Sequence, residues 1–245
     1  MASNSIPSKG LYLDWCSHEA AKFAMEHWHY SGVLQAGKCS KIGVWEDGKF
    51  IGAVVFTAGS GSTTKWATNV GLKREEMAEL ARIGLTLHIS PVSRIVSIAL
   101  RLLRIQSPGI RLIVSYADPR EGHHGGIYQA GGWAYVGQTP PDVRYIDRSG
   151  REHHPRMACV SGVKISFGAI KHVVKTEDCR KIEVPGKYKY LMPLDSAMRE
   201  KIEKLRQPYP KRVKMDAVST PHQSADESDP PAPTCLGQEA VLQNP

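Results

Sequence analysis

The stretch Leu112–Gly137, LIVSYADPREGHHGGIYQAGGWAYVG, predicts more about this chain than any other. It opens with an apolar run long enough for a buried strand, and an Asp-Pro pair at Asp118 ends that strand. Glycines then surround His123 and His124, so backbone can approach a ligand closely. A short helical turn containing Tyr128 and a second strand follow. A buried strand that delivers a carboxylate, two imidazoles and a phenol to one loop indicates a functional site.

The same residues also have a simpler interpretation. Asp118 would then cap a turn in a glycine-rich connection, and the histidines would be ordinary loop residues. A side chain at a strand end is held rigidly and still faces the space beyond the sheet. We therefore favour the functional interpretation for Asp118 and Tyr128. For His123 and His124 we leave both interpretations open, the functional one being contact with the substrate or DNA.

A second candidate region lies near the N-terminus. Ser17 is expected to cap a helix from about His18 to Tyr30, with alanines and a tryptophan on its packed face. The helix ends in EHWHYSG, which contains His29. Histidines two residues apart point to different sides of a helix, so this spacing is not a ready-made metal pair. In the simpler interpretation, His29 only ends the helix at the negative end of its dipole.

The segments YADPREGHHGGIYQAGGW and EHWHYSG resemble the Mom family of phage DNA-modification proteins, which are related to the GNAT acyltransferases. The resemblance covers roughly residues 18–195. It implies an α/β (α+β) fold of the GNAT type, with a central mixed sheet flanked by helices. It also implies an enzyme that converts adenine in duplex DNA to N6-methylcarbamoyl adenine and so protects phage DNA from restriction. Since a paired base is inaccessible, the adenine should be flipped out of the duplex.

The resemblance also implies roles for individual residues. Asp118, Tyr128, His29 and Tyr30 are the expected catalytic residues. Asp118 would act as a base or hold the exocyclic amine, and Tyr128 would orient the substrate or relay a proton. The family further suggests iron, for which His29, Tyr30 and Asp118 would be the ligands. The second expected cofactor is acetyl-CoA or a related acyl donor.

A long amphipathic helix is expected after His88, running to about Gln106. Its N-terminus follows a strand and is therefore suited to a pyrophosphate. In acyltransferases of the GNAT type, coenzyme A binds here, but their usual glycine-containing signature is absent from this sequence. Ser90 is expected to cap the helix, with Pro91 at its first position. The predicted donor-binding residues are Ser90, Ser93, Arg94 and Ser97.

Met77–Leu85 is predicted to be a strand, with Glu79 and Arg82 on opposite faces by alternation. Arg82 lies in a mostly apolar run, and a buried arginine needs an acidic partner or an anionic ligand. The sequence leaves open whether Arg82 forms a structural ion pair or contacts the substrate.

Two further segments carry recognisable local signals. Asp47-Gly48 between two strand-like runs predicts a β-hairpin. Gly59–Thr64, GSGSTT, is expected to be a polar loop that acts as a flexible lid, because it lacks the ending of a phosphate-binding loop.

The segment Gly186–Tyr190 interleaves cations with aromatic rings. Lys187 and Lys189 are therefore candidate DNA contacts, because such a pattern can follow a phosphate backbone. The alternative is an edge strand protected from pairing by its lysines, which the sequence alone favours slightly.

The net charge of +8 understates how basic most of the chain is. Residues 216–245 contain five acidic residues and no Lys or Arg, so residues 1–215 carry a formal charge of +13. Such a body suits a polyanion such as double-stranded DNA. Residues 1–215 are expected to form the catalytic domain, and 216–245 a disordered acidic Pro/Ser-rich tail.

The sequence also predicts a cellular location. No signal peptide or membrane span is expected, and five scattered cysteines argue against a disulfide framework or a cysteine zinc site. These features favour the reducing cytoplasm, which would be that of a bacterial host if a phage encodes the chain. They do not give the oligomeric state, and a homodimer is one option.

Two other functions fit part of this pattern. An N-acyltransferase for a small-molecule or peptide amine would share the fold but would not need such a basic body. A DNA-binding protein without catalytic activity would need the charge but not the candidate catalytic residues. The salt dependence of DNA binding separates the first of these from a DNA-modifying enzyme, because phosphate contacts give a steep slope.

Overall fold

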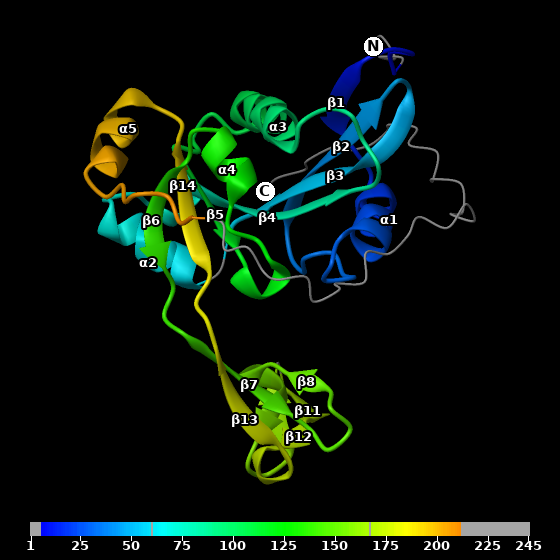
Figure 1. Ribbon diagram of the computed structural model, residues 1–245, viewed down its shortest axis with the longest axis vertical. Helices are drawn as coiled ribbons and strands as arrows, with labels where there is room; N and C mark the ends of the chain where they lie inside the picture. Colours follow the sequence, from blue (N-terminus) through cyan, green and yellow to red (C-terminus); the bar gives the residue numbers. More distant parts are fainter. Residues whose placement is uncertain (1–5, 60, 167, 212–245) are drawn as a thin grey trace. The chain divides into compact units, whose positions relative to one another are not determined.

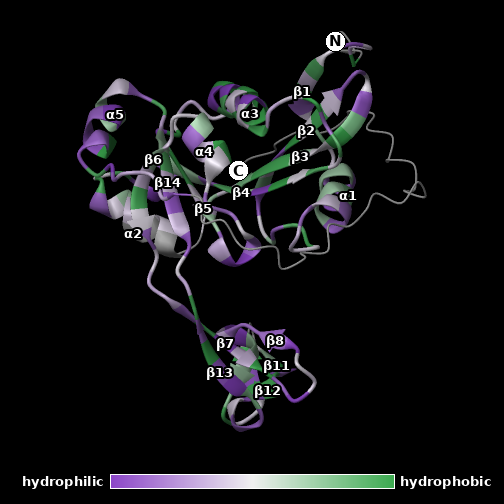
Figure 2. Ribbon diagram, in the orientation of Figure 1, coloured by the Kyte–Doolittle hydropathy of each residue, from purple (hydrophilic) through white to green (hydrophobic). Residues whose placement is uncertain are grey.

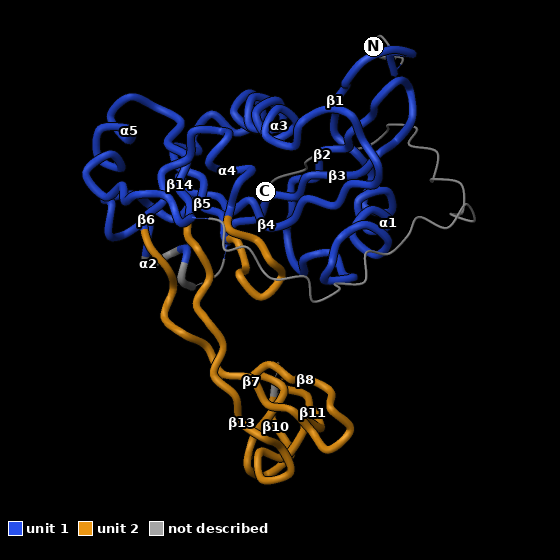
Figure 3. The backbone as a smooth tube through the Cα atoms, viewed as in Figure 1, with its two compact units in different colours: residues 1–116, 125–136, 190–245 blue, residues 117–124, 137–189 orange. Residues whose placement is uncertain are grey.

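A computed structural model describes residues 6–59, 61–166 and 168–211 (Figure 1). The chain forms two compact units (Figure 3). Unit 2 comprises residues 117–124 and 137–189, and unit 1 comprises the other described residues. The sequence did not predict this division. The expected disordered tail from residue 216 onward lies outside the described residues.

Unit 1 is built around a seven-stranded sheet in the order β1-β2-β3-β4-β5-β14-β6. The first four of these strands pair antiparallel, and β4 pairs parallel with β5, so the sheet is mixed. Its strands are β1 (Leu11–Trp15), β2 (Cys39–Glu46), β3 (Lys49–Thr57), β4 (Met77–Leu85), β5 (Leu112–Ala117), β6 (Ala134–Gln138) and β14 (Tyr188–Pro193).

Helices cover both faces of this sheet, with α1 and α2 on one side and α3 and α4 on the other (Figure 1). The helices are α1 (His18–Trp28), α2 (Gly61–Asn69), α3 (Val92–Gln106), α4 (Gly126–Ala130) and α5 (Ser196–Glu203), and a 3-10 turn, η1 (Arg74–Glu76), precedes β4. The strands between the helices are largely apolar, as expected when both faces are buried (Figure 2). The predicted mixed α/β class is confirmed.

Helix α1 forms where the sequence predicts it. The Ser17 hydroxyl accepts a hydrogen bond from the backbone N–H of Ala20 at 3.1 Å and so caps the helix. The buried alanines of α1 pack on β3, and Gly84 on β4 permits the close approach. A Cβ at Gly84 would lie 2.7 Å from the carbonyl oxygen of Ala24. The predicted end at Tyr30 is wrong, because His29 already has extended backbone angles and α1 ends at Trp28.

The predicted hairpin between β2 and β3 is confirmed. Asp47 and Gly48 both have positive φ angles, 49° and 77°, as a two-residue type I′ turn requires. The predicted loop at Gly59–Thr64 is wrong over most of its length, because α2 begins at Gly61.

The capping prediction for α3 is also wrong. Pro91 occupies the cap position, and the helix begins at Val92 without a side-chain cap. The carboxylate of Glu46, at the end of β2, instead accepts hydrogen bonds from the backbone N–H groups of Ile89 at 2.7 Å and Ser90 at 2.8 Å. A carboxylate distant in sequence therefore holds the segment before α3, and the helix itself has no side-chain cap.

A β-bulge in β4 changes which side chains share a face. Val55 of β3 pairs with Arg82, but the next residue, Phe56, pairs with Leu80, so one residue of β4 is extra. Such an insertion shifts the alternation of side chains beyond it. Glu79 and Arg82 consequently lie on the same face, and the predicted opposite placement is wrong.

Unit 2 contains short strands and turns. Its three-stranded sheet has the order β13-β7-β8, β9 pairs parallel with β12, and β10 and β11 form a hairpin. The elements are η2 (Pro119–Glu121), β7 (Asp142–Ile146), β8 (Glu152–His153), η3 (Pro155–Met157), β9 (Ala158–Cys159), β10 (Val163–Ser166), β11 (Ala169–His172), β12 (Val174–Lys175), η4 (Thr176–Asp178) and β13 (Arg180–Val184).

The Lys187–Tyr190 region is not at a sheet edge. Strand β14 is hydrogen-bonded between β5 and β6, so the edge-strand interpretation is wrong.

Within the described part of the chain, no helix combines the length and apolarity needed to cross a bilayer.

Candidate functional site

The sheet of unit 1 opens between β4 and β5. The two strands pair from Met77 with Leu112 to Leu80 with Ser115, and β4 then continues to Leu85 along β3 alone. The backbone of β4 beyond Leu80 is therefore not paired with β5. The two strands diverge beyond the pair Leu80 and Ser115.

A buried chain of hydrogen bonds marks the point of divergence. The Ser115 hydroxyl lies 2.7 Å from the carbonyl oxygen of Leu80 and 2.8 Å from the Tyr128 hydroxyl. A carbonyl only accepts, and the Ser115 hydroxyl has one proton, so Ser115 donates to Leu80 and Tyr128 donates to Ser115. The phenol oxygen of Tyr128 keeps its acceptor capacity for a further group.

Packing fixes the ring of Tyr128. Its centroid lies 5.0 Å from that of Trp133 and 5.1 Å from that of Tyr190. Gly125, which precedes α4, has a φ of 83°, and a Cβ there would collide with the Tyr190 ring. Glycine is thus required twice over at this position, by backbone angle and by space. The aromatic cluster holds the phenol in one orientation.

The electrostatic environment keeps Tyr128 protonated. Burial is the main cause that raises the pKa of its phenol to about 12. The hydrogen bond with Ser115 opposes this rise, and electrostatic interactions with Tyr30, Tyr190 and Glu79 add to it. The hydroxyl is therefore a hydrogen-bond donor throughout the physiological pH range. It is not suited to accept a proton as a base.

Glu79 is a further candidate site residue, which the sequence does not single out. Its carboxylate accepts a hydrogen bond from the buried hydroxyl of Thr63 on α2 at 2.9 Å. Glu79 pairs with Thr57 of β3, and Thr57 lies on the same face of the sheet as Val55, which packs beneath α1. Glu79 therefore lies on the face that α1 covers. The only sequence signal was one acidic residue in the apolar run MAELARIGL. A carboxylate on the same strand as the divergence point is a candidate general base.

Arg82 shares that face with Glu79. One guanidinium nitrogen donates to the carbonyl of Ala81 at 3.0 Å, while its buried Nε has no hydrogen-bond partner. Among the described residues, Arg82 forms no ion pair with a carboxylate. A buried donor without an acceptor is costly unless a ligand supplies one. This favours substrate contact over the structural ion pair.

His29 and Tyr30 lie just beyond α1, with ring centroids 4.3 Å apart. The backbone N–H of Ser31 donates to Nδ1 of His29 at 3.1 Å, so in the neutral ring Nε2 carries the proton. This tautomer does not present Nε2 to a metal. No group of three His, Cys, Asp or Glu side chains among the described residues is placed to hold a metal ion. The iron ligand set expected from the resemblance is therefore not supported.

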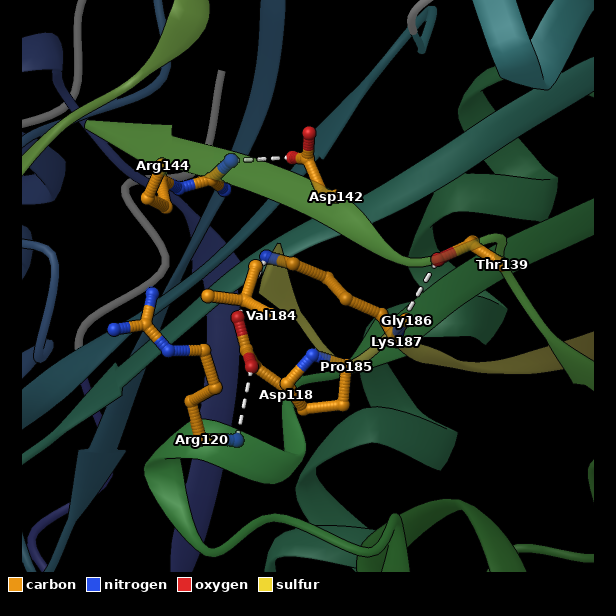
Figure 4. A pocket seen from close by; sticks show the side chains of 9 residues that line it. All are labelled: Asp118, Arg120, Thr139, Asp142, Arg144, Val184, Pro185, Gly186 and Lys187. Atoms are coloured by element: carbon orange, nitrogen blue, oxygen red, sulfur yellow. Dashed lines mark hydrogen bonds and ion pairs between the residues drawn. The ribbon is translucent and has the colours of Figure 1, made fainter. Parts of the chain in front are cut away.

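Asp118 belongs to unit 2. It caps η2 by accepting from the backbone N–H of Arg120 at 3.0 Å, and it forms an ion pair with Lys187 at 3.0 Å. These contacts lie in a small pocket of about 80 Å³, which Arg144 also lines (Figure 4). Asp118 therefore caps a turn, as the simpler interpretation predicts. Its catalytic role stays a prediction.

The other predicted DNA contacts also lie in unit 2. His123 is exposed and His124 is half-buried, and their roles stay predictions. Lys187 is engaged with Asp118. Lys189 is buried, and burial lowers the pKa of its ammonium. A buried ammonium does not suit a contact with a phosphate backbone, so this part of the prediction is corrected.

The predicted donor residues lie along the start of α3. Arg94 and Ser97 are exposed on one face, Ser93 is half-buried, and Ser90 precedes the helix. The N–H of Ile89 holds the pKa of Glu46 below its usual value, so a carboxylate already occupies the N–H groups before the helix. A donor pyrophosphate at Ser93, Arg94 and Ser97 stays a prediction.

Comparisons with known proteins give one family and several distant structures. The sequence profile of the Mom protein family matches residues 10–211. No curated protein sequence matches this chain.

Three of the similar solved structures are acetyltransferases. A candidate phosphinothricin N-acetyltransferase is 13% identical, with a TM-score of 0.43 over 76% of this chain and 100% of its own. An N-acetyltransferase from Staphylococcus aureus Mu50 is 10% identical, with a TM-score of 0.41 over 76% and 100%. A GNAT family acetyltransferase from Elizabethkingia anophelis, with acetyl-CoA bound, is 10% identical, with a TM-score of 0.36 over 76% and 99%. At TM-scores below 0.5 these likenesses carry no conclusion about what this chain acts on.

Proposed function

Because this chain belongs to the Mom protein family, we propose that it modifies adenine in duplex DNA, transferring an acyl-type group to the exocyclic nitrogen N6. The product implied by the family is N6-methylcarbamoyl adenine. Acetyl-CoA alone would give N6-acetyl adenine, so the donor for that product is a related acyl thioester that already carries the nitrogen of the methylcarbamoyl group. The arrangement that supports this most strongly is the buried chain Tyr128–Ser115–Leu80 where β4 and β5 diverge.

Different residues of unit 1 have separate chemical roles in such a transfer. With any thioester donor, a bond forms from N6 to the carbonyl carbon, the carbon–sulfur bond breaks, N6 loses a proton and sulfur leaves as thiolate. Glu79 accepts the proton from N6, since it is the carboxylate on the face of β4 beneath α1. Arg82 uses its unpartnered Nε to hold an acceptor atom of the flipped base.

Tyr128 stabilises charge and does not give up its proton. A phenol with a pKa of about 12 would lose a proton to a thiolate, whose conjugate acid has a pKa of about 8.5, only at a cost of roughly 5 kcal/mol. A hydrogen bond to the developing thiolate or oxyanion carries no such cost. Tyr128 therefore acts as a donor by turning its hydroxyl from Ser115 toward the developing charge, while Ser115 keeps its own hydrogen bond to Leu80.

Nucleoside mass spectrometry of DNA from cells that express the protein tests the proposal. Wild type should yield modified adenine, and Glu79→Gln and Tyr128→Phe should each lower its yield about 10²–10⁴-fold. The matched control is Glu75→Gln, which removes an exposed carboxylate four residues earlier and should leave the yield unchanged. Both site variants should still bind duplex DNA with the wild-type salt slope.

Asp118→Asn tests the remaining sequence prediction separately. The amide keeps an oxygen to accept from the Arg120 N–H but loses the charge paired with Lys187. We expect normal duplex binding and no modified adenine. A wild-type yield would reduce Asp118 to a cap. If purified wild type acylates a small amine and never DNA, the proposed substrate is wrong.

A further inference from the structure

The β10–β11 hairpin of unit 2 exposes apolar side chains on one face. Ile165 pairs across the hairpin with Ile170, and Val163 pairs with His172 two positions away, so these side chains share a face. Ile165 is 79% exposed, Ile170 69% and Val163 40%. Nothing in the described part of unit 2 covers this face.

The opposite face of the hairpin is attached to the rest of the unit. The ammonium of Lys164 donates to the carbonyl oxygens of Pro155 at 3.0 Å and Arg156 at 3.1 Å. Because side chains alternate along a strand, anchoring Lys164 turns the isoleucine face outward. The exposure of Ile165 and Ile170 is thus a consequence of how the hairpin is held.

An exposed pair of isoleucines on a two-stranded ribbon would promote association with other protein molecules if nothing covered it.

The charge around the isoleucine face indicates what occupies it. Unit 2 contains twelve Lys and Arg against eight Asp and Glu, a formal charge of +4. Lys171, Arg180 and Lys181 are exposed and form no ion pair with any described residue. Lysine is depleted from protein–protein interfaces, whereas protein–DNA interfaces are strongly positive.

We propose that the β10–β11 hairpin is a DNA-binding ribbon that enters a groove of the duplex. Ile165 and Ile170 contact bases, as the apolar wedges of other DNA-binding proteins do. Lys171, which pairs with Lys164 and is exposed on the opposite face of the hairpin, contacts a phosphate that flanks the groove. This inference rests on the proposed function, because it assumes that duplex DNA is the substrate. It assigns to unit 2 a substrate-holding role separate from the chemistry of Glu79 and Tyr128.

The decisive variant is Ile165→Thr/Ile170→Thr, measured by fluorescence anisotropy with a labelled duplex at several salt concentrations. Threonine is also β-branched, so the strand propensity is kept. The affinity should fall at least about tenfold, with the salt slope unchanged because no cation is lost. The matched control is Ile105→Thr on α3, where the isoleucine is equally exposed at 79% and the affinity should not change.

Lys171→Gln is expected to show the complementary behaviour. Loss of one phosphate contact should lower the salt slope by about 0.9 and weaken binding to all sequences alike. Circular dichroism should show that every variant is folded, and nucleoside mass spectrometry should show less product from the double threonine variant.

Three outcomes would overturn the inference. The double threonine variant binds DNA as tightly as wild type, which leaves the proposed function intact because wild type still binds and modifies. Light scattering shows that the variant changes only the oligomeric state, in which case the partner is a second copy of the chain. Wild type itself binds no duplex, in which case the proposed function fails together with this inference.

Discussion

Unit 1 and unit 2 are stabilised by different interactions. Unit 1 buries large side chains such as Trp133, Phe56 and Tyr190, whereas the buried apolar residues of unit 2 are small, namely Ala117, Ala158 and Val184. Conversely, eight of the thirteen ion pairs among the described residues lie in unit 2. Apolar burial is insensitive to salt and pH, while partly exposed ion pairs depend on both. The two units should therefore fail under different conditions.

The largest effect should come from the aromatic core of unit 1. Trp133→Ala removes a ring that is 1% exposed and packs on Tyr128, and it should lower the free energy of unfolding by about 3–5 kcal/mol. Urea unfolding followed by circular dichroism measures this. The control is Trp15→Ala, on the edge strand β1, which should cost under about 1 kcal/mol. Equal losses would mean that burial does not distinguish the two tryptophans.

A smaller and local effect is expected in unit 2. Arg144 forms ion pairs with both Asp142 and Glu152 and is itself largely buried. Arg144→Met should weaken β7 and its neighbours by about 1–3 kcal/mol, seen as lost hydrogen-exchange protection there and not in β3 or β4. Arg148→Met removes a highly exposed arginine paired with Asp178 and should change little. Lost protection in β3 would contradict the independence of the units.

The smallest effect should be an acid response confined to unit 2. The hydrogen bond from Arg120 lowers the pKa of Glu152, and that from Ser149 lowers the pKa of Asp147. A carboxyl whose folded pKa is depressed stabilises the fold above its unfolded pKa of about 4. That stabilisation is lost as the pH falls through the folded pKa. Hydrogen-exchange protection, corrected for intrinsic rates, should therefore decline in β7 as the pH falls from about 5 to about 2 while β3 stays protected. A parallel decline in both strands would show that the units share one acid transition.

Local signals explain the parts of the fold that the sequence predicts well. The Ser17 cap, the Asp47-Gly48 turn and the bounds of β4 each depend on residues close together in the chain. The bonds from Ile89 and Ser90 to Glu46 span more than forty positions, so local sequence could not predict how the segment before α3 is held.

In the candidate site, too, the features that depend on nearby residues are predictable and those that depend on distant strands are not. Tyr128 stands out because glycines and a strand end surround it, and the structure places it in a buried hydrogen-bonded chain. In the sequence alone, Glu79 is one polar residue in a predicted strand of alternating side chains. Its orientation depends on a bulge whose register only β3 reveals. The position of β14 between β5 and β6 is likewise decided by strand pairing over long distances.

The pairing of β6 with β14 has a consequence for how this chain is put together. Between the end of β6 and the start of β14 the chain makes a long excursion, yet it leaves and returns on neighbouring strands. Thr139 and Lys187 are hydrogen-bonded to each other at the two ends of that excursion, through backbone and hydroxyl contacts of 2.9 Å. In topological terms the excursion is the tip of a single hairpin, so its length has little effect on the strands that carry it. This is a position at which a module can be inserted, exchanged or shortened to a tight turn while the register of the parent sheet is preserved.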